Sequence, residues 1–510
     1  MGALIRWGII ALVAVTATAQ VHENVTVELI EVPVYVFGPD GKPVRGLTKE
    51  NFELRVDRRQ QPIEYFDAMD FGVATTSAPS QQPRTQRERR LYLLLFDQLY
   101  SLPTRLARAQ RAAEYVVEHS NRASDLFAVA TYTSNKGVQF ATPFICDRAA
   151  LRRAIETLSV STARDPFHVA MSAAERMTWD EKENDLGLIK TGKFDSEVEE
   201  TIRGGAANQD ALAEQSKQSI EDQLADYADL AQRLSQLEGQ KHVLLFSEGF
   251  DSTKIHGGNN PVPVDLRSGG GLDARSFRVL DQTFQKFRSA GVFLDAVDIA
   301  GLHHDPSKPY DNDSLQFLAH GTGGEFVHNR NDFANAVTEL TESQQVVYLL
   351  AFNRRDARAG SIDVRVHGIP RGSRVSFRQG FGKASRSTDV DPLQLADILI
   401  NDVPQSGINI RLTASASELA VQLPTDEIVP QLVDKTPDVE TILYVFDSNG
   451  SAVFGGEKTI KFTAAEREKK DPIVLRRRID LPAGHYVAKA IARIAGTTSL
   501  GFARTEFTVP

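Results

Sequence analysis

Continuous apolar runs alternate with amphipathic segments through the middle of this 510-residue chain, and this pattern narrows the possible folds more than any other feature. The runs that we interpret as strands are LYLLLF (91–96), LFAVATYT (126–133), HVLLFS (242–247), VFLDAVDI (292–299) and VVYLLAF (346–352). Between them apolar residues recur at helical spacing, as do Phe277, Leu280 and Phe284. Buried strands separated by helices are typical of a mostly parallel sheet covered on both faces. We therefore expect a doubly wound α/β fold over residues 91–355.

The flanking segments have a different pattern, that of short strands joined by turns. The boundaries that we predict are a small β segment at 20–70, a linker at 71–90, a β extension at 356–385 and an immunoglobulin-like β-sandwich at 395–510. Within the α/β region, residues of about 180–238 form a polar insertion that ends in a long helix. The apolar face of that helix contains Ile220, Leu224, Tyr227, Ala231 and Leu234.

The first 19 residues have the features of a secretory signal peptide. Arg6 supplies a positive charge, an apolar stretch follows, and Ala17-Thr18-Ala19 is a small-x-small cleavage site before Gln20. The alternative, a retained membrane anchor, is disfavoured because 7–19 is shorter than the ~20 residues of a spanning helix. We therefore expect a secreted or periplasmic protein.

Composition excludes some functions and limits how the fold is stabilised. The formal charge is −9 and the pI is about 5.8, so no basic surplus exists to neutralise the phosphates of a nucleic acid. Cys146 is the only cysteine, so no disulfide can form within the chain. An exported chain without disulfides depends on sizeable apolar cores, which this length permits.

Oxygen-bearing side chains follow the predicted strands. In a doubly wound sheet ligands bind at the carboxyl ends of the strands. The loops expected there are 97–101 (DQLYS), Ser161-Thr162 and 247–251 (SEGFD). Hydroxyl and carboxylate oxygens that converge from separate loops are the ligands that Mg²⁺ prefers. We name the first and third loops the rim.

The order of these segments also resembles that of a known family. The order of the strand before Asp97, DRAALRRAI, LLFSEGF and LAHGTGGEF over 91–355 is similar to that of a von Willebrand factor type A domain. With the preceding VPVYVFGPDGKPVRGLTKENFELRVD, the region of about 25–385 resembles the bacterial VWFA-related family of exported proteins.

The resemblance implies a metal-ion-dependent adhesion site. In that family the site uses Asp-x-Ser-x-Ser, a threonine from a second loop and an acid from a third. The matching residues are Asp97, Ser101, Thr162 and Glu248, whereas Leu99 stands where a ligand serine belongs. The implied cation is Mg²⁺, or Ca²⁺ or Mn²⁺, at a degenerate site.

The residues alone leave another role open for the first acid of this site. Asp97 could accept hydrogen bonds from free N–H groups at the helix start near Pro103. In that role it would stabilise the loop and bind no metal.

The resemblance also implies a function, which is the recognition of a protein or cell-surface ligand without catalysis. The residues that we expect to contact the partner are Gln98, Tyr100, Phe250 and Asp251 of the rim. An alternative from another class is a structural component of the cell envelope that binds no metal.

A metal-dependent hydrolase centred on His303-His304-Asp305 is a further alternative. Adjacent histidines point in different directions on a strand, and no third ligand at zinc-site spacing is evident. We therefore interpret them as loop residues. Gly321-Thr322-Gly323-Gly324 precedes a strand, so we interpret it as the turn after a helix and not as a phosphate cradle.

Overall fold

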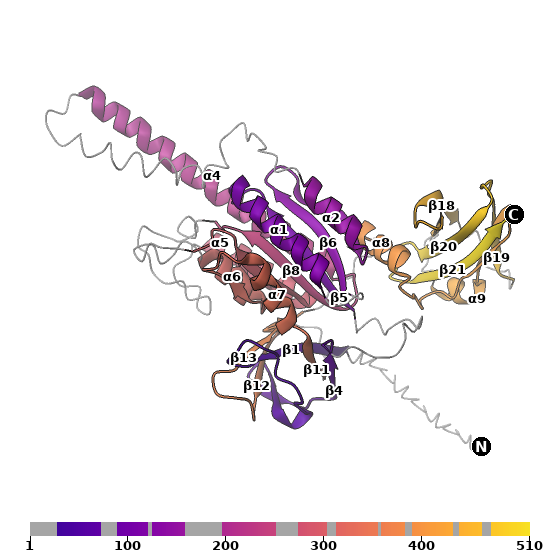
Figure 1. The fold of residues 1–510 in the computed structure, drawn as a ribbon, viewed down its shortest axis with the longest axis horizontal. Helices are drawn as coiled ribbons and strands as arrows, with labels where there is room; N and C mark the ends of the chain where they lie inside the picture. The colour runs from indigo at the N-terminus through magenta and orange to yellow at the C-terminus, as the bar shows by residue number, and fades with distance from the viewer. Residues whose placement is uncertain are drawn as a thin grey trace, which may run out of the picture.

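The structure is a computed structural model of the chain (Figure 1). It describes residues 28–72, 89–120, 125–158, 196–250, 274–302, 313–354, 359–382, 390–431, 438–461 and 471–510, with the side chains of 28, 196–213 and 313 excepted. The predicted signal peptide, the greater part of the predicted linker, Thr162, Asp251 and His303-His304-Asp305 lie outside these ranges. No helix within them is both long and apolar enough to cross a bilayer.

The central unit is built on a six-stranded sheet with the order β10-β9-β8-β5-β6-β7. Its strands are β5 (Arg90–Asp97), β6 (Asp125–Thr133), β7 (Gly137–Ile145), β8 (Gln240–Ser247), β9 (Val292–Asp298) and β10 (Phe326–Val327). Five strands run parallel, and β7 pairs antiparallel with β6. The sheet is therefore mixed.

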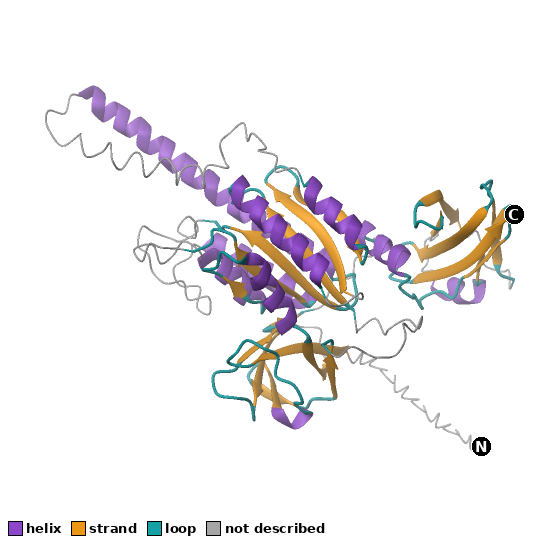
Figure 2. Cartoon of the chain, in the orientation of Figure 1, coloured by secondary structure: helices purple, strands orange, loops and turns teal. Residues whose placement is uncertain are grey.

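Helices cover both faces of this sheet, as Figure 2 shows. One face carries α1 (Pro103–His119), α2 (Arg148–Thr157) and α7 (Phe333–Ser343), and the other carries α4 (Ser196–Leu234), α5 (Ala274–Ala290) and α6 (Asp313–Thr322). Side chains of β5 enter the two cores in alternation, with Leu93 in the α4 core and Leu94 in the α1 core. This alternation follows from the two-residue period of a strand. The predicted apolar face of α4 is confirmed, because Ile220, Leu224 and Tyr227 are buried.

A second unit combines the start of the chain with the segment after the central unit. Its strands are β1 (Glu28–Phe37), β2 (Phe52–Val56), β3 (Arg59–Gln61), β4 (Tyr65–Asp70), β11 (Val346–Arg354), β12 (Gly360–Val366), β13 (Arg374–Phe377) and β14 (Gly380–Phe381), with the 3-10 turn η1 (Lys49–Asn51) before β2. They form two antiparallel sheets, β13-β1-β11-β4 and β14-β12-β2-β3, around one apolar core. The central unit is thus an insertion within this β unit.

The fold class that we expected from the sequence is wrong for the chain. Of the five sheets in the described residues, four are wholly antiparallel and one is mixed, so the chain is not a doubly wound parallel fold with β appendages. The run VVYLLAF, expected to complete the parallel sheet, is β11 and pairs antiparallel with β1. The physical reason is that a short continuous apolar run fits the core of a sandwich as well as a parallel sheet.

The third unit is at the C-terminal end and also has two antiparallel sheets. Its elements are α8 (Pro392–Asn401), β15 (Arg411–Ala414), β16 (Glu418–Leu423), α9 (Thr425–Ile428), η5 (Val429–Gln431), β17 (Asp438–Phe446), β18 (Ala452–Lys461), β19 (Ile473–Arg478), β20 (Gly484–Ile494) and β21 (Leu500–Val509). The sheets β15-β16-β19 and β18-β17-β20-β21 share one apolar core. Helix α8 joins this unit to the central one, since Asn401 Nδ2 donates to the Phe144 carbonyl at 2.8 Å and Asp391 pairs with Arg233 at 2.9 Å.

The β unit meets the central sheet at the amino ends of the parallel strands. The Tyr35 hydroxyl lies 2.9 Å from Nε2 of His242, at the start of β8, and the Tyr35 ring packs against Phe293 at the start of β9. The ion pair between Arg374 and Glu325 (2.6 Å) adds a contact at the same end. The rim lies at the carboxyl ends of β5 and β8. It is therefore at the opposite end of the parallel strands from the β unit.

The turn predicted at Gly321 to Gly324 is confirmed, because α6 ends at Thr322 and β10 begins at Phe326. Gly324 lies against the backbone of β9, and a Cβ placed on it would be 2.1 Å from the Leu294 carbonyl oxygen. That contact involves main chain, which cannot rotate away.

We expect Gly324→Ala to lower the free energy of unfolding by about 1–3 kcal/mol, the range of overpacking changes. Urea denaturation followed by circular dichroism would measure the loss. Gly456→Ala is the matched control, since a Cβ there has only Arg477 at 4.0 Å. Equal stability of the two variants would contradict the close packing of the turn on β9.

Candidate functional site

The rim is assembled by the pairing of two neighbouring parallel strands. Phe96 of β5 is in register with Phe246 of β8, so Asp97 and Ser247, the next residues, lie side by side where both strands end. The Ser247 hydroxyl donates to Oδ2 of Asp97 at 2.7 Å. The structure thus brings together the two rim loops that the sequence placed at this edge.

Asp97 is buried, with 1% of its surface exposed, and protein donors surround its carboxylate. Oδ1 accepts hydrogen bonds from the backbone N–H of Leu99 (2.9 Å) and Tyr100 (3.2 Å). Oδ2 accepts from Ser247 and from Nε2 of Gln223 (3.2 Å). Four donors therefore hold this acid, and two of them belong to its own loop.

Glu248 performs the capping role that we had considered for Asp97. Its Oε1 accepts from the backbone N–H of Leu102, the N-cap residue of α1, at 2.6 Å, and its Oε2 pairs with Arg105 in the first turn of that helix. The first N–H groups of a helix lack partners within the helix, so this carboxylate completes the start of α1. Ser101 Oγ accepts from the Glu248 backbone N–H at 3.3 Å and joins the two loops.

The remaining described rim residues contribute to the core beneath α4. Leu99, which replaces a ligand serine, is buried there together with Tyr100 and Phe250. The Tyr100 and Phe250 rings meet edge-on, with centroids 6.0 Å apart. Gln98 is half-buried, and its backbone N–H donates to the Tyr132 carbonyl at 3.0 Å. A partner could therefore touch the two aromatic rings only if α4 moved away.

Sequence reasoning missed the contribution of α4 to this site. Gln223 is buried and donates both to Asp97 and to the Tyr227 hydroxyl, the latter at 3.0 Å. The available signal was position, because Gln223 directly precedes Leu224 and lies one turn before Tyr227, both on the predicted apolar face. An amide so close to that face needs a buried partner.

Burial determines the electrostatics of the rim. Desolvation raises the pKa of Asp97 above its ordinary value, and the hydrogen bonds from Ser247 and Tyr100 partly oppose this rise. Desolvation also raises the pKa of Tyr100 and Tyr227, and the nearby charge of Asp97 adds to both shifts. These tyrosines therefore stay neutral at physiological pH.

The described donors of the rim, a set without Thr162 and Asp251, do not fit a divalent cation. Among the described residues no group of three or more His, Cys, Asp or Glu side chains is placed to hold a metal. The oxygens of Asp97 and Glu248 already accept protein hydrogen bonds, and the position of the missing serine is an apolar side chain. An octahedral Mg²⁺ would have to displace several of these donors.

Comparisons with known proteins do not identify a family. No family model matches the sequence, and no curated protein matches it. Membership of the VWFA-related family therefore stays a prediction from the sequence.

Solved structures similar to the chain include an aerotolerance-related membrane protein from Bacteroides fragilis NCTC 9343, with 11% identity, a TM-score of 0.26, and coverage of 50% of this chain and 99% of that one. BatB from Bacteroides thetaiotaomicron has 10% identity, a TM-score of 0.25 and the same coverage. The pilus adhesin SpaC from Lactobacillus rhamnosus GG has 9% identity, a TM-score of 0.26, and coverage of 93% of this chain and 57% of that one. At such scores we draw no conclusion from these likenesses.

We expect Glu248→Ala to reduce the free energy of unfolding by about 2 kcal/mol, because the start of α1 loses an acceptor and Arg105 loses its partner. Glu248→Gln keeps an oxygen for the Leu102 N–H and should lose less. Chemical denaturation of the two variants would compare them. Equal losses would mean that the carboxylate does not cap the helix.

The raised pKa of Asp97 predicts a pH dependence of stability. Between the unfolded pKa of about 3.9 and the raised folded pKa, the folded state binds more protons, so the free energy of unfolding falls as the pH rises. Asp97→Asn cannot titrate and removes this contribution. We expect the stability of the wild type relative to Asp97→Asn to decrease with pH through that window and to level off above it. Urea denaturation at a series of pH values would measure it, and a relative stability that increases with pH would contradict burial as the dominant cause.

Proposed function

We propose that the chain is an exported, non-enzymatic protein-binding module of the adhesion type that works without a divalent cation. The observation that carries the proposal is the state of the two rim acids. Both are buried, and Asp97 accepts hydrogen bonds from its own loop, from Ser247 and from α4, whereas Glu248 accepts them from the start of α1. In this arrangement they serve as structural acceptors and support neither acid–base chemistry nor cation binding.

The construction of the molecule also supports a binding role. Three separately cored units are joined by specific polar contacts, such as Tyr35 with His242 and Asn401 with Phe144. Folded units with their own cores present preformed surfaces to a partner, which lowers the entropic cost of association. Because Tyr100 and Phe250 are buried, these two rings are not the binding surface, and we assign binding to a surface other than the rim loops.

Cation independence can be tested by thermal unfolding of the mature chain in EDTA and with Mg²⁺, Ca²⁺ or Mn²⁺ added. A cation bound only by the folded state at 100 times its Kd would add about 2.7 kcal/mol, which visibly raises the midpoint. We expect the same midpoint in all buffers. A cation-dependent rise in the wild type that is lost in Asp97→Asn would show a working metal site and overturn this part of the proposal.

Protein binding can be tested by surface plasmon resonance against a panel of immobilised extracellular-matrix and cell-envelope proteins, in EDTA and in Mg²⁺. We expect saturable binding to at least one of them, with the same affinity in both buffers. Absence of saturable binding to every panel member would instead favour a structural envelope component.

A further inference from the structure

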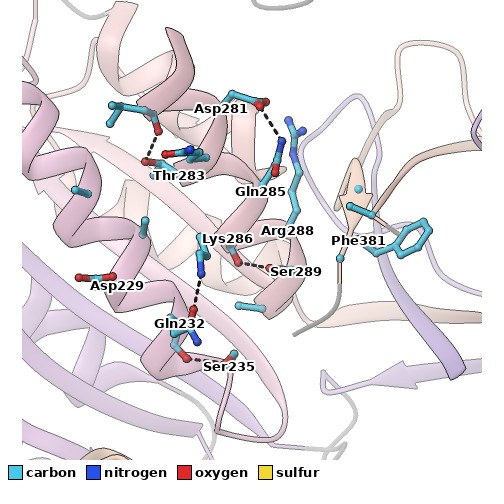
Figure 3. Close-up of a pocket in the computed structure, with 18 of the residues that line it drawn as sticks. Asp229, Gln232, Ser235, Asp281, Thr283, Gln285, Lys286, Arg288, Ser289 and Phe381 are labelled. Atoms are coloured by element: carbon cyan, nitrogen blue, oxygen red, sulfur yellow. Dashed lines mark hydrogen bonds between the residues drawn. The ribbon is translucent and has the colours of Figure 1, made fainter. Parts of the chain in front are cut away.

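A groove of about 1060 Å³ lies where α4, α5 and the β14 segment meet (Figure 3), and no described rim residue is part of its lining. One wall is the outer face of α4, another is α5, and the third comes from the β unit at 359–361 and 379–382. The groove is therefore formed jointly by the central unit and the β unit. Nothing in the sequence analysis pointed to it.

The depth of the groove follows from the residues that α4 places along it. Ala225 and Ala228 lie on the same face as Asp222 and Asp229, so small side chains alternate with acidic ones at helical spacing. Thr283 of α5 donates to the Leu224 carbonyl at 2.9 Å, which holds the two helices close together at the floor. This buried hydrogen bond fixes the floor of the groove.

Each basic residue that lines the groove has a hydrogen-bond or ion-pair partner within the protein, but only that of Arg275 is charged. Arg275 pairs with the buried carboxylate of Glu221 at 2.8 Å, and Lys286 donates to Oε1 of Gln232 at 2.6 Å. Arg288 donates to the Gly321 carbonyl at 2.8 Å. These contacts direct the cationic groups to partners within the protein.

Three acidic residues of the groove are not neutralised in this way. Asp222 and Asp281 accept a hydrogen bond only from a neutral amide, that of Gln218 (2.6 Å) and Gln285 (2.7 Å) respectively. Among the described residues Asp229, which is exposed, has no hydrogen-bond or ion-pair partner. The charge of Arg288 acts on Asp281, but the lining as a whole has five acidic residues, which include Asp57 and Glu221, against three basic ones. The groove therefore keeps a net negative formal charge.

The raised pKa of a neighbouring acid agrees with a negative potential at the groove. The pKa of Asp226, on the adjacent face of α4, is raised first by desolvation and then by the charges of Asp229 and Asp222. Like charges held at one site disfavour each other's ionised form, and a cation that entered the site would relieve this repulsion.

We propose that this groove binds an extended, lysine- or arginine-bearing segment of a partner protein, with its cationic side chains on Asp222, Asp229 and Asp281. The inference rests on the proposed protein-binding function and assigns its surface. Side-chain amides and hydroxyls along the same walls, those of Gln282, Ser235 and Ser289 among them, are suited to the backbone of an extended chain. A compact metal site is not formed, since the described acids make no cluster that could hold an ion.

The test measures the fluorescence anisotropy of a labelled nonapeptide of alternating lysine and serine on the full mature chain. The acidic counterpart, with glutamate for lysine, is measured in parallel. The test variant is the triple substitution Asp222→Asn, Asp229→Asn and Asp281→Asn. The matched control is Asp426→Asn, Asp471→Asn and Asp480→Asn, three exposed acids of the C-terminal unit that change the net charge equally. Circular dichroism melting confirms that both triples remain folded.

We expect the lysine peptide to bind the wild type and the control triple alike, and the groove triple roughly tenfold more weakly, the effect of three exposed ion pairs. The glutamate peptide should not bind. Equal weakening in both triples, equal binding of both peptides, or no binding of the lysine peptide would each overturn the proposal.

The same variants separate this inference from the proposed function. If a panel protein binds the groove triple as tightly as the wild type, the groove is not the binding surface, although protein binding stands. If no panel protein binds while the lysine peptide still discriminates between the two triples, the proposed function fails and the groove remains a site for basic segments.

Discussion

The antiparallel pairing of β1 with β11 is the constraint on which the rest of the structure depends. Seven residue pairs, from Glu28 with Arg354 to Val34 with Tyr348, join the start of the described chain to the segment that follows the central unit. The chain leaves the β unit after β4 and returns at β11, which pairs antiparallel with β4 from Asp70 with Val346 onward, so exit and re-entry lie on neighbouring strands. This closure places the amino ends of β8 and β9 against Tyr35, while the opposite end of the sheet packs against α4 and the start of α1. It also brings the β14 segment next to α5, so the groove is a consequence of the same pairing.

At the carboxyl ends of β5 and β8, two buried acids accept hydrogen bonds that stabilise the surrounding loops and helices. A buried carboxylate is unfavourable unless hydrogen bonds surround it, and Asp97 and Glu248 each meet this requirement with donors of the protein. The same positions could serve a cation only if those donors were released. The leucine at 99 makes such a release less favourable, because its side chain is packed in the core that the donors help to hold. Stability of the rim and cation binding therefore oppose each other in this chain.

Local sequence patterns predicted the strands, helix faces and turns that are determined by residues close together in the chain. The strand that ends at Asp97, the apolar face of α4 with Ile220 and Leu224, and the turn at Gly324 all follow from periodicity or backbone freedom. The missed features depend on pairing between distant segments. The residues of VVYLLAF do not indicate whether the strand pairs with β9 in the central sheet or with β1 in the β unit, because a buried strand is apolar in either sheet. The amide of Gln223 was missed for the same reason, since its partner Asp97 is 126 residues away.

Helix α4 connects the rim with the groove that we propose as the binding surface. Its inner face holds the rim through Gln223 and Tyr227, and its outer face contributes Asp222 and Asp229 to the groove. A helix anchored by buried hydrogen bonds on one face cannot rotate freely, so the spacing of the acids on its other face is fixed. The hydrogen bonds that occupy Asp97 thereby help to preorganise the groove. In this view the rim acids act in binding from a distance, as the support for the helix that carries the charges.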